Sequence, residues 1–279
     1  MKHVLVGADG SAGAADAMRW ASRLAARHGA ELVVMTGFQP VDSELRPGRL
    51  ETLVARQEQE LTSWCEEAEL DEAPVRTIVE QGDPGPALLA VAEREGADLI
   101  VVGRVGRSAG PGLLHLGSMA EWLAHHVDRP VAILSEGASL TTDNVLVAVD
   151  GSDGSRAAVE WVRDLAVDSD MRVAVASVDE TVDEWTPDDS RDAWRQDLER
   201  LILDDYAAGL VGTGVDVDAV TLHGTDVADV LLQAARERGS DLVVVGARGL
   251  GGLTGLRIGG VALKTLHRAD RPVVLVPPL

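Results

Sequence analysis

The 279-residue sequence contains a single cysteine, Cys65, so no disulfide can form within the chain. A disulfide framework like that of small secreted domains is therefore excluded. The apolar stretch at the start, within MKHVLVGADG, is too short for a signal peptide and is predicted to be a strand. We expect a cytoplasmic protein in which Cys65, on an apolar helix face with Leu61 and Trp64, is a core residue rather than a reactive thiol.

Long apolar runs and positive charge are also scarce. No run approaches the roughly 18 apolar residues that a membrane-spanning helix needs. The chain has 46 acidic and 25 basic residues, a formal net charge of −21, and its only lysines are Lys2 and Lys264. Because this charge repels nucleic acids and anionic membranes at long range, neither is an expected partner.

What the sequence does contain is a long internal repeat. Residues 4–11 read VLVGADGS, and residues 145–152 read VLVAVDGS. Residues 98–106, DLIVVGRVG, correspond in the same way to residues 241–249, DLVVVGARG. The offset between matching positions stays at 141 to 143 residues, which indicates one duplicated domain rather than a solenoid of short repeats.

Each copy is long enough to form its own core. We place the two domains at residues 1–138 and 143–279, joined by the small and polar stretch GASLTTDN, residues 137–144. In both copies the sequence DRPV leads into the last predicted strand.

Short runs of Val, Ile and Leu alternate with amphipathic stretches in both copies. Such runs are typical of strands that are buried on both faces of a parallel sheet. The alternation predicts two doubly wound α/β domains, each with a five-stranded parallel sheet in the order 3-2-1-4-5. The predicted strands lie near residues 3–8, 31–37, 75–80, 98–102 and 131–134, and near residues 145–149, 172–178, 216–222, 241–245 and 273–276.

Polar and glycine-rich segments follow the first and fourth predicted strands. Asp9 and Asp150 come directly after a first strand, and loops that begin at Gly103 and Gly246 come after a fourth. In a sheet of this order the two positions flank the point where ligands bind. Glycines let backbone N–H groups approach a phosphate, and the helix that follows each loop adds its dipole. The nearby arginines Arg104, Arg107, Arg248 and Arg257 would supply positive charge.

The whole chain resembles a tandem universal stress protein. The resemblance rests on VGADGS and VAVDGS, on DLIVVGRVG and DLVVVGARG, and on DRPV. It implies binding of ATP, ADP or AMP, with the strand-1 aspartate on the adenine side and the glycine loop around ribose and phosphates; Mg²⁺ can accompany the nucleotide. The implied contacts are Asp9, Gly103, Gly106, Gly117 and Ser118 in the first copy, and Asp150, Val178, Gly246, Gly249, Gly259 and Gly260 in the second. Ala8, Val149, Arg248 and Val261 complete the predicted site.

Both glycine loops depart from the family pattern. The first carries one extra residue between Gly106 and Gly117, and Ala120 stands where a second hydroxyl is common. The second has the usual spacing, but Gly260 stands where a hydroxyl is expected. Because spacing decides where every amide points, we expect the second copy to be the tighter site. Replacing Asp9 and Asp150 together by alanine is expected to abolish binding and leave the fold intact.

No enzyme class fits the sequence as well as a binding module. Residues 106–110, GRSAG, match the hydrolase elbow Gly-x-Ser-x-Gly around Ser108, but Pro111 and Gly112 follow where that elbow needs a helix. A P-loop is absent from the sequence, and its seven histidines include no i, i+4 ligand pair, so no metal site is predicted. Two function classes stay open: a nucleotide-binding stress-response sensor or regulator, and a family member that acts only as a protein-interaction scaffold.

The fifth predicted strand of each copy would leave an apolar sheet edge, which soluble proteins rarely leave bare. Residues 130–135 and 272–277 are expected to cover each other by antiparallel pairing about a pseudo-twofold axis within the chain. Such an internal pair can associate further into a homodimer.

Overall fold

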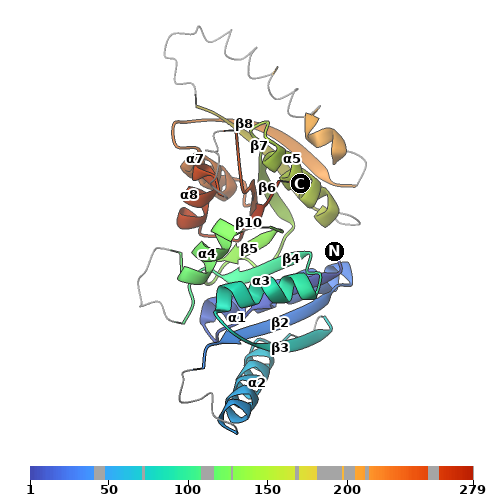
Figure 1. The fold of residues 1–279 in the computed structure, drawn as a ribbon. Coiled ribbons are helices and arrows are strands. Elements are labelled where there is room, and N and C mark those ends of the chain that lie inside the picture. Colours follow the sequence, from blue (N-terminus) through green and yellow to red (C-terminus); the bar gives the residue numbers. More distant parts are fainter. Residues whose placement is uncertain are drawn as a thin grey trace. The chain divides into compact units, whose positions relative to one another are not determined.

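The computed structural model describes residues 1–40, 48–70, 73–107, 116–126, 128–166, 170–180, 197, 205–210, 214–250 and 258–278. The chain divides into two compact units, Met1–Leu140 and Thr141–Leu279. Each unit is a parallel sheet with helices (Figure 1).

The first unit contains five strands, and every strand pair in it is parallel. The order across the sheet is β3-β2-β1-β4-β5. In this unit α1 packs beside α2 and α3 beside α4, and the helices lie on both faces of the sheet (Figure 1). The elements are β1 (His3–Gly7), α1 (Ala12–His28), β2 (Glu31–Phe38), α2 (Arg49–Glu67), β3 (Val75–Gln81), α3 (Pro84–Arg94), β4 (Leu99–Gly103), α4 (Ser118–His126) and β5 (Val131–Leu134).

The second unit has the same plan, with the order β8-β7-β6-β9-β10 and parallel pairing throughout. The doubly wound α/β class predicted from the sequence is confirmed in both units. The described elements are β6 (Asn144–Ala148), α5 (Asp153–Ala166), β7 (Arg172–Asp179), a 3₁₀ turn (Ala207–Gly209), β8 (Asp216–His223), α7 (Val227–Glu237), β9 (Leu242–Gly246), α8 (Gly260–Arg268) and β10 (Val273–Val276).

The central strands are buried because helices cover both of their faces. Val4, Leu5 and Val6 of β1 are completely inaccessible, as are their counterparts Leu146 and Val147 in β6. Burying one such side chain contributes about 1.5–3 kcal/mol, so these strands anchor each unit. Their carboxyl ends are thereby fixed in place, and the loops that follow them start from rigid positions.

Helix α1 has local signals at both of its ends. Ser11 is the N-cap, and its side chain accepts a hydrogen bond of 3.2 Å from the backbone N–H of Ala14. At the other end Gly29 adopts a left-handed conformation, φ 61°, and its N–H reaches the carbonyls of Ala25 and Ala26. The helix therefore begins immediately after the Asp-Gly-Ser segment, which places that segment at the carboxyl end of β1.

The repeated DRPV segment has a structural role. The Arg129 side chain donates to the carbonyls of Ala92, at 2.9 Å, and Ala97, which lie at the end of α3 and just beyond it. Arg271 does the same in the second unit, toward the carbonyls of Ala235 and Ser240. Each arginine caps the carbonyl end of a helix, where positive charge is favourable. The repeat thus ties the lead into the last strand to the preceding helix.

Cys65 is half-buried on α2, less completely than the sequence analysis expected of a core residue. Burial, with a smaller contribution from the charge on Glu66, raises the pKa of the Cys65 thiol to about 11. We expect the native thiol to react slowly with iodoacetamide at pH 8, because only about one molecule in a thousand carries the thiolate there. Denaturation in urea should speed the reaction at least tenfold, as followed by mass spectrometry; equal rates in both states would contradict a shielded thiol.

Candidate functional site

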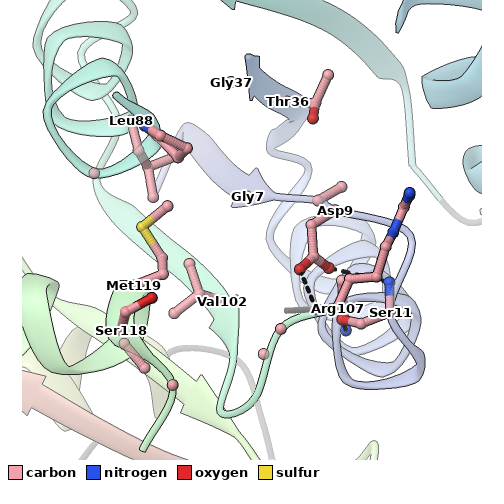
Figure 2. A pocket seen from close by; sticks show the side chains of 18 of the residues that line it. Gly7, Asp9, Ser11, Thr36, Gly37, Leu88, Val102, Arg107, Ser118 and Met119 are labelled. Atoms are coloured by element: carbon pink, nitrogen blue, oxygen red, sulfur yellow. Dashed lines mark hydrogen bonds between the residues drawn. The ribbon is translucent and has the colours of Figure 1, made fainter. Parts of the chain in front are cut away.

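A cleft of about 840 Å³ lies in the first unit at the carboxyl ends of β1, β2 and β4. All six residues that the sequence analysis predicted in the first copy line it: Ala8, Asp9, Gly103, Gly106, Gly117 and Ser118. Figure 2 labels Asp9 and Ser118 among them. The structure therefore brings together side chains and loops that are up to 110 positions apart in the sequence, counted from Ala8 to Ser118.

Asp9 connects the loops on the two sides of the cleft. Its Oδ1 accepts a hydrogen bond of 3.0 Å from the N–H of Ser11, and its Oδ2 accepts one of 2.7 Å from the N–H of Arg107 (Figure 2). The first bond shapes the turn into α1, and the second fastens the loop after β4. The carboxylate therefore has a structural role that is independent of any ligand.

The two glycines of the Gly-x-x-Gly segment are required by close packing. A Cβ atom added to Gly106 would lie 2.5 Å from Oδ2 of Asp9. One added to Gly103 would lie 2.7 Å from the carbonyl carbon of Gly13 and 2.9 Å from the amide nitrogen of Ala14. At Gly103 the obstacle is backbone that cannot move aside. At Gly106 it is the carboxylate of Asp9, which would have to shift away from its hydrogen bonds with Ser11 and Arg107. The segment after β4 thus fits against the start of α1 only when both positions lack a side chain.

The phosphate end predicted from the sequence is the start of α4. The N–H of Gly117 donates 2.8 Å to the carbonyl of Arg104, which holds the helix start against the loop after β4. Ser118 is exposed at the first helical position and faces the cleft in Figure 2. The first amides of a helix have no partner within it, so they and the Ser118 hydroxyl can donate to an anion.

Between Asp9 and Ser118 the wall of the cleft is apolar. Leu88, Val102 and Met119 line this middle part (Figure 2), and the hydroxyl of Thr36 lies at its edge near Gly37. An apolar middle with polar groups at both ends suits a flat, uncharged ring joined to a charged tail. The sequence analysis identified none of these wall residues, because they come from β2, α3, β4 and α4 and only tertiary packing brings them together.

In the second unit Asp150 makes the same connection with one more bond. Its Oδ1 accepts from the N–H of Ser152, at 3.0 Å, and from the Ser152 hydroxyl, at 2.6 Å; its Oδ2 accepts 3.0 Å from the N–H of Leu250. A Cβ atom on Gly249 would collide with Oδ2 of Asp150. One on Gly246 would lie 2.5 Å from the carbonyl carbon of Gly154.

The other predicted residues of the second copy lie on the same edge of its sheet. Buried Val149 donates its N–H to the carbonyl of Ala176, and Val178 belongs to β7. Gly259 is the N-cap of α8, Gly260 is its first residue, and Val261 is 40% exposed. Arg248 follows β9 on the surface.

A hydroxyl network in the second unit has no equivalent in the first. The Ser155 hydroxyl lies 3.3 Å from the hydroxyl of Tyr206 and donates 2.8 Å to the carbonyl of Ser152. Tyr206 is 7% exposed. In the first copy the residue that corresponds to Tyr206 is Trp64, at an offset of 142. The residue that corresponds to Ser155 is Ala14, at an offset of 141. The repeat offset could have paired Trp64 with Tyr206, but it does not indicate that either residue lies at a site.

Comparison with known proteins settles the family. The model of the universal stress protein family matches residues 1–135 and, a second time, residues 141–277. The chain belongs to the universal stress protein family. Two relatives match over nearly their whole length. One is a universal stress protein of Mycolicibacterium smegmatis, 29% identical over 99% of this chain and 97% of its own; the other is from Mycobacterium tuberculosis, 30% identical over 98% of this chain and 95% of its own. A universal stress protein of Archaeoglobus fulgidus shares the fold, with a TM-score of 0.75, 18% identity and coverage of 99% and 98% of the two chains.

Other readings of this universal stress protein gain no support from the structure. Ser108 and the residues that follow it up to 115, as well as Gly251, lie outside the described residues, so the structure does not test the hydrolase elbow. Among the residues that are described, no three His, Cys, Asp or Glu side chains are grouped as metal ligands. None of the described helices has the length and apolar character to cross a membrane.

Proposed function

We propose that this universal stress protein binds an adenine nucleotide, ATP, ADP or AMP, and acts in the stress response as a sensor or regulator, not as an enzyme. The observation that carries the proposal is the cleft of the first unit. Its volume, about 840 Å³, lies in the range of small-molecule sites, and its apolar wall is flanked by an anion-binding helix start. The family resemblance supplies the identity of the base.

The geometry suggests how the nucleotide would lie. The base would rest against Leu88 and Val102, and the phosphates would reach Ser118 and the first amides of α4. Asp9 would face the nucleoside. Two of the roughly four lone-pair positions on its carboxylate are occupied by backbone donors, so the other two can accept hydrogen bonds from the nucleoside. Mg²⁺ would enter with the phosphates, as it usually does.

The first copy is the better candidate for the nucleotide site, whereas the loop spacing in the sequence favoured the second copy. Asp150 already accepts three hydrogen bonds against two at Asp9, so less of its capacity is left for a ligand. The first copy also has a hydroxyl at Ser118, where the second has Gly260.

Photolabelling with 8-azido-ATP tests the proposal on the full chain. We expect saturable labelling that excess ATP or AMP suppresses, and labelled peptides that come mainly from residues 1–140. Labelling confined to residues 141–279 would place the site in the other copy. Absence of saturable labelling would favour the scaffold function.

Association through the fifth strands, within the chain or in a homodimer, stays a prediction from the sequence. It does not depend on nucleotide binding.

A further inference from the structure

Arg107 is an unusual cation for this chain. Acidic residues outnumber basic ones by 46 to 25, and most described arginines lie within 4 Å of a carboxylate. Arg107 forms no ion pair with any residue that the structure describes, although it lines the cleft. An arginine left unpaired among so many carboxylates is available to an anion that comes from outside the chain.

The guanidinium of Arg107 is held in place by an aromatic ring. Its central carbon lies 5.2 Å from the centroid of Trp64, on α2, within the range of a cation–π interaction. Gly10 makes room for the pair, because its φ is 75° and a Cβ atom there would lie 2.5 Å from a terminal nitrogen of Arg107 and 2.7 Å from the Trp64 ring. The backbone N–H of Arg107 is fixed as well, by its bond to Asp9.

The described acidic side chains that line the cleft form no ion pair with the guanidinium of Arg107, although Asp9 accepts from its backbone N–H. Glu60, one turn before Trp64, already accepts from Arg56 at 3.0 Å and from Gln57 at 3.2 Å. Asp83, at the start of α3, forms no side-chain cap bond. The ring and the backbone bond therefore orient Arg107, and none of the carboxylates that the structure describes forms an ion pair with its guanidinium.

The second copy lacks this arrangement. Leu250, 74% exposed, follows Gly249 where Arg107 follows Gly106. Tyr206 takes the place of Trp64, and its ring contacts Arg156 of α5 at 5.3 Å instead of a residue of the glycine loop. Arg248 stands one residue before the second glycine of its loop, not after it.

We propose that Arg107, positioned by Trp64, binds a phosphate monoester of the nucleotide and makes the first copy select phosphorylated nucleosides over unphosphorylated ones. The inference rests on the proposed nucleotide function, and it names the Arg107 guanidinium as the group that would bind the phosphate. The phosphate can be a group on the ribose, in the pose described above, or the 5′ group of a nucleotide that lies in the opposite direction along the cleft. Both are dianionic monoesters that a guanidinium can bind through two hydrogen bonds.

The test compares adenosine, 5′-AMP and 3′-AMP on the full-length chain by calorimetric titration. In Arg107→Gln we expect the affinity for one of the two AMP isomers to fall about tenfold, with adenosine changed less than twofold. Added salt should lower the affinity of the wild type for that isomer and have little effect on the affinity of the variant. The isomer that responds identifies the phosphate that Arg107 contacts.

Trp64 is tested as a positioning residue. Trp64→Leu should lower the ratio of AMP to adenosine affinity in the same direction as Arg107→Gln, and Trp64→Phe, which keeps a ring, should restore it. The matched control is Arg172→Gln, since Arg172 is an exposed arginine at the start of β7 with no ion pair to a described residue. It should leave the ratio unchanged.

The outcomes separate the two proposals. If the wild type binds neither adenosine nor AMP, the proposed function fails. If it binds them but Arg107→Gln changes neither AMP isomer, or weakens adenosine and AMP equally, only the role of Arg107 is refuted.

Discussion

Gly246→Ala is expected to lower the free energy of unfolding of the second unit by about 2–3 kcal/mol. The added methyl would lie 2.5 Å and 2.7 Å from the carbonyl carbon and oxygen of Gly154 and 2.9 Å from the amide nitrogen of Ser155. All three are backbone atoms at the start of α5, so relief requires the helix or the strand end to move.

Gly260→Ala is the matched control for this loop. A Cβ atom there meets nothing within 4 Å, and Gly260 is the first residue of α8. Alanine should leave stability unchanged or raise it by up to about 1 kcal/mol, because it reduces the freedom of the unfolded chain. Urea denaturation followed by circular dichroism measures both variants, and equal midpoints for the two would contradict the packing argument.

Asp150→Ala should destabilise the second unit by about 3 kcal/mol. The change removes the acceptor of three hydrogen bonds, from the N–H and hydroxyl of Ser152 and from the N–H of Leu250. Bonds to a charged acceptor each contribute about 1.5–3 kcal/mol, and water can replace part of that at the exposed Leu250. Asp9→Ala removes the acceptor of two hydrogen bonds, so it should destabilise the first unit by less than Asp150→Ala destabilises the second.

Asp83→Ala provides the comparison for loss of an acidic side chain at the cleft. Asp83 is exposed and makes no cap bond, so its removal should change stability by less than about 0.5 kcal/mol. A stability loss at Asp150 no larger than at Asp83 would contradict the structural role of the carboxylate. That the Asp9→Ala and Asp150→Ala variants keep their fold stays a prediction. Because both carboxylates accept hydrogen bonds from neighbouring loops, binding must be measured on variants whose folding has been checked.

The fold was predictable because each signal was local and occurred twice. The runs of Val, Ile and Leu identified every strand to within two residues, and the repeat supported each assignment with a second copy. The role of Arg129 and Arg271 in capping helices could not be predicted from the sequence. The carbonyls that they contact lie more than thirty residues away, and no local sequence pattern indicates such a contact.

The candidate site was predictable only in part. Asp9 lies just after β1, Gly103 ends β4 and Ser118 begins α4, so the parallel sheet alone gathers them at one edge. Trp64 could not be placed in the same way. It lies in the middle of α2, where helical spacing assigned it to an apolar face, and its contact with Arg107 depends on how α2 packs.

The contact of Gly103 with the first turn of α1, and of Gly246 with the first turn of α5, has an evolutionary consequence. Because Gly103 meets Gly13, and Gly246 meets Gly154, backbone against backbone, substitution at any of these positions is opposed whether or not a ligand binds. A copy that lost its nucleotide would keep its glycines for as long as it kept its fold. The positions that packing leaves free to drift, such as 107, 118 and 260, are then the ones whose residues record what each copy has been selected to bind.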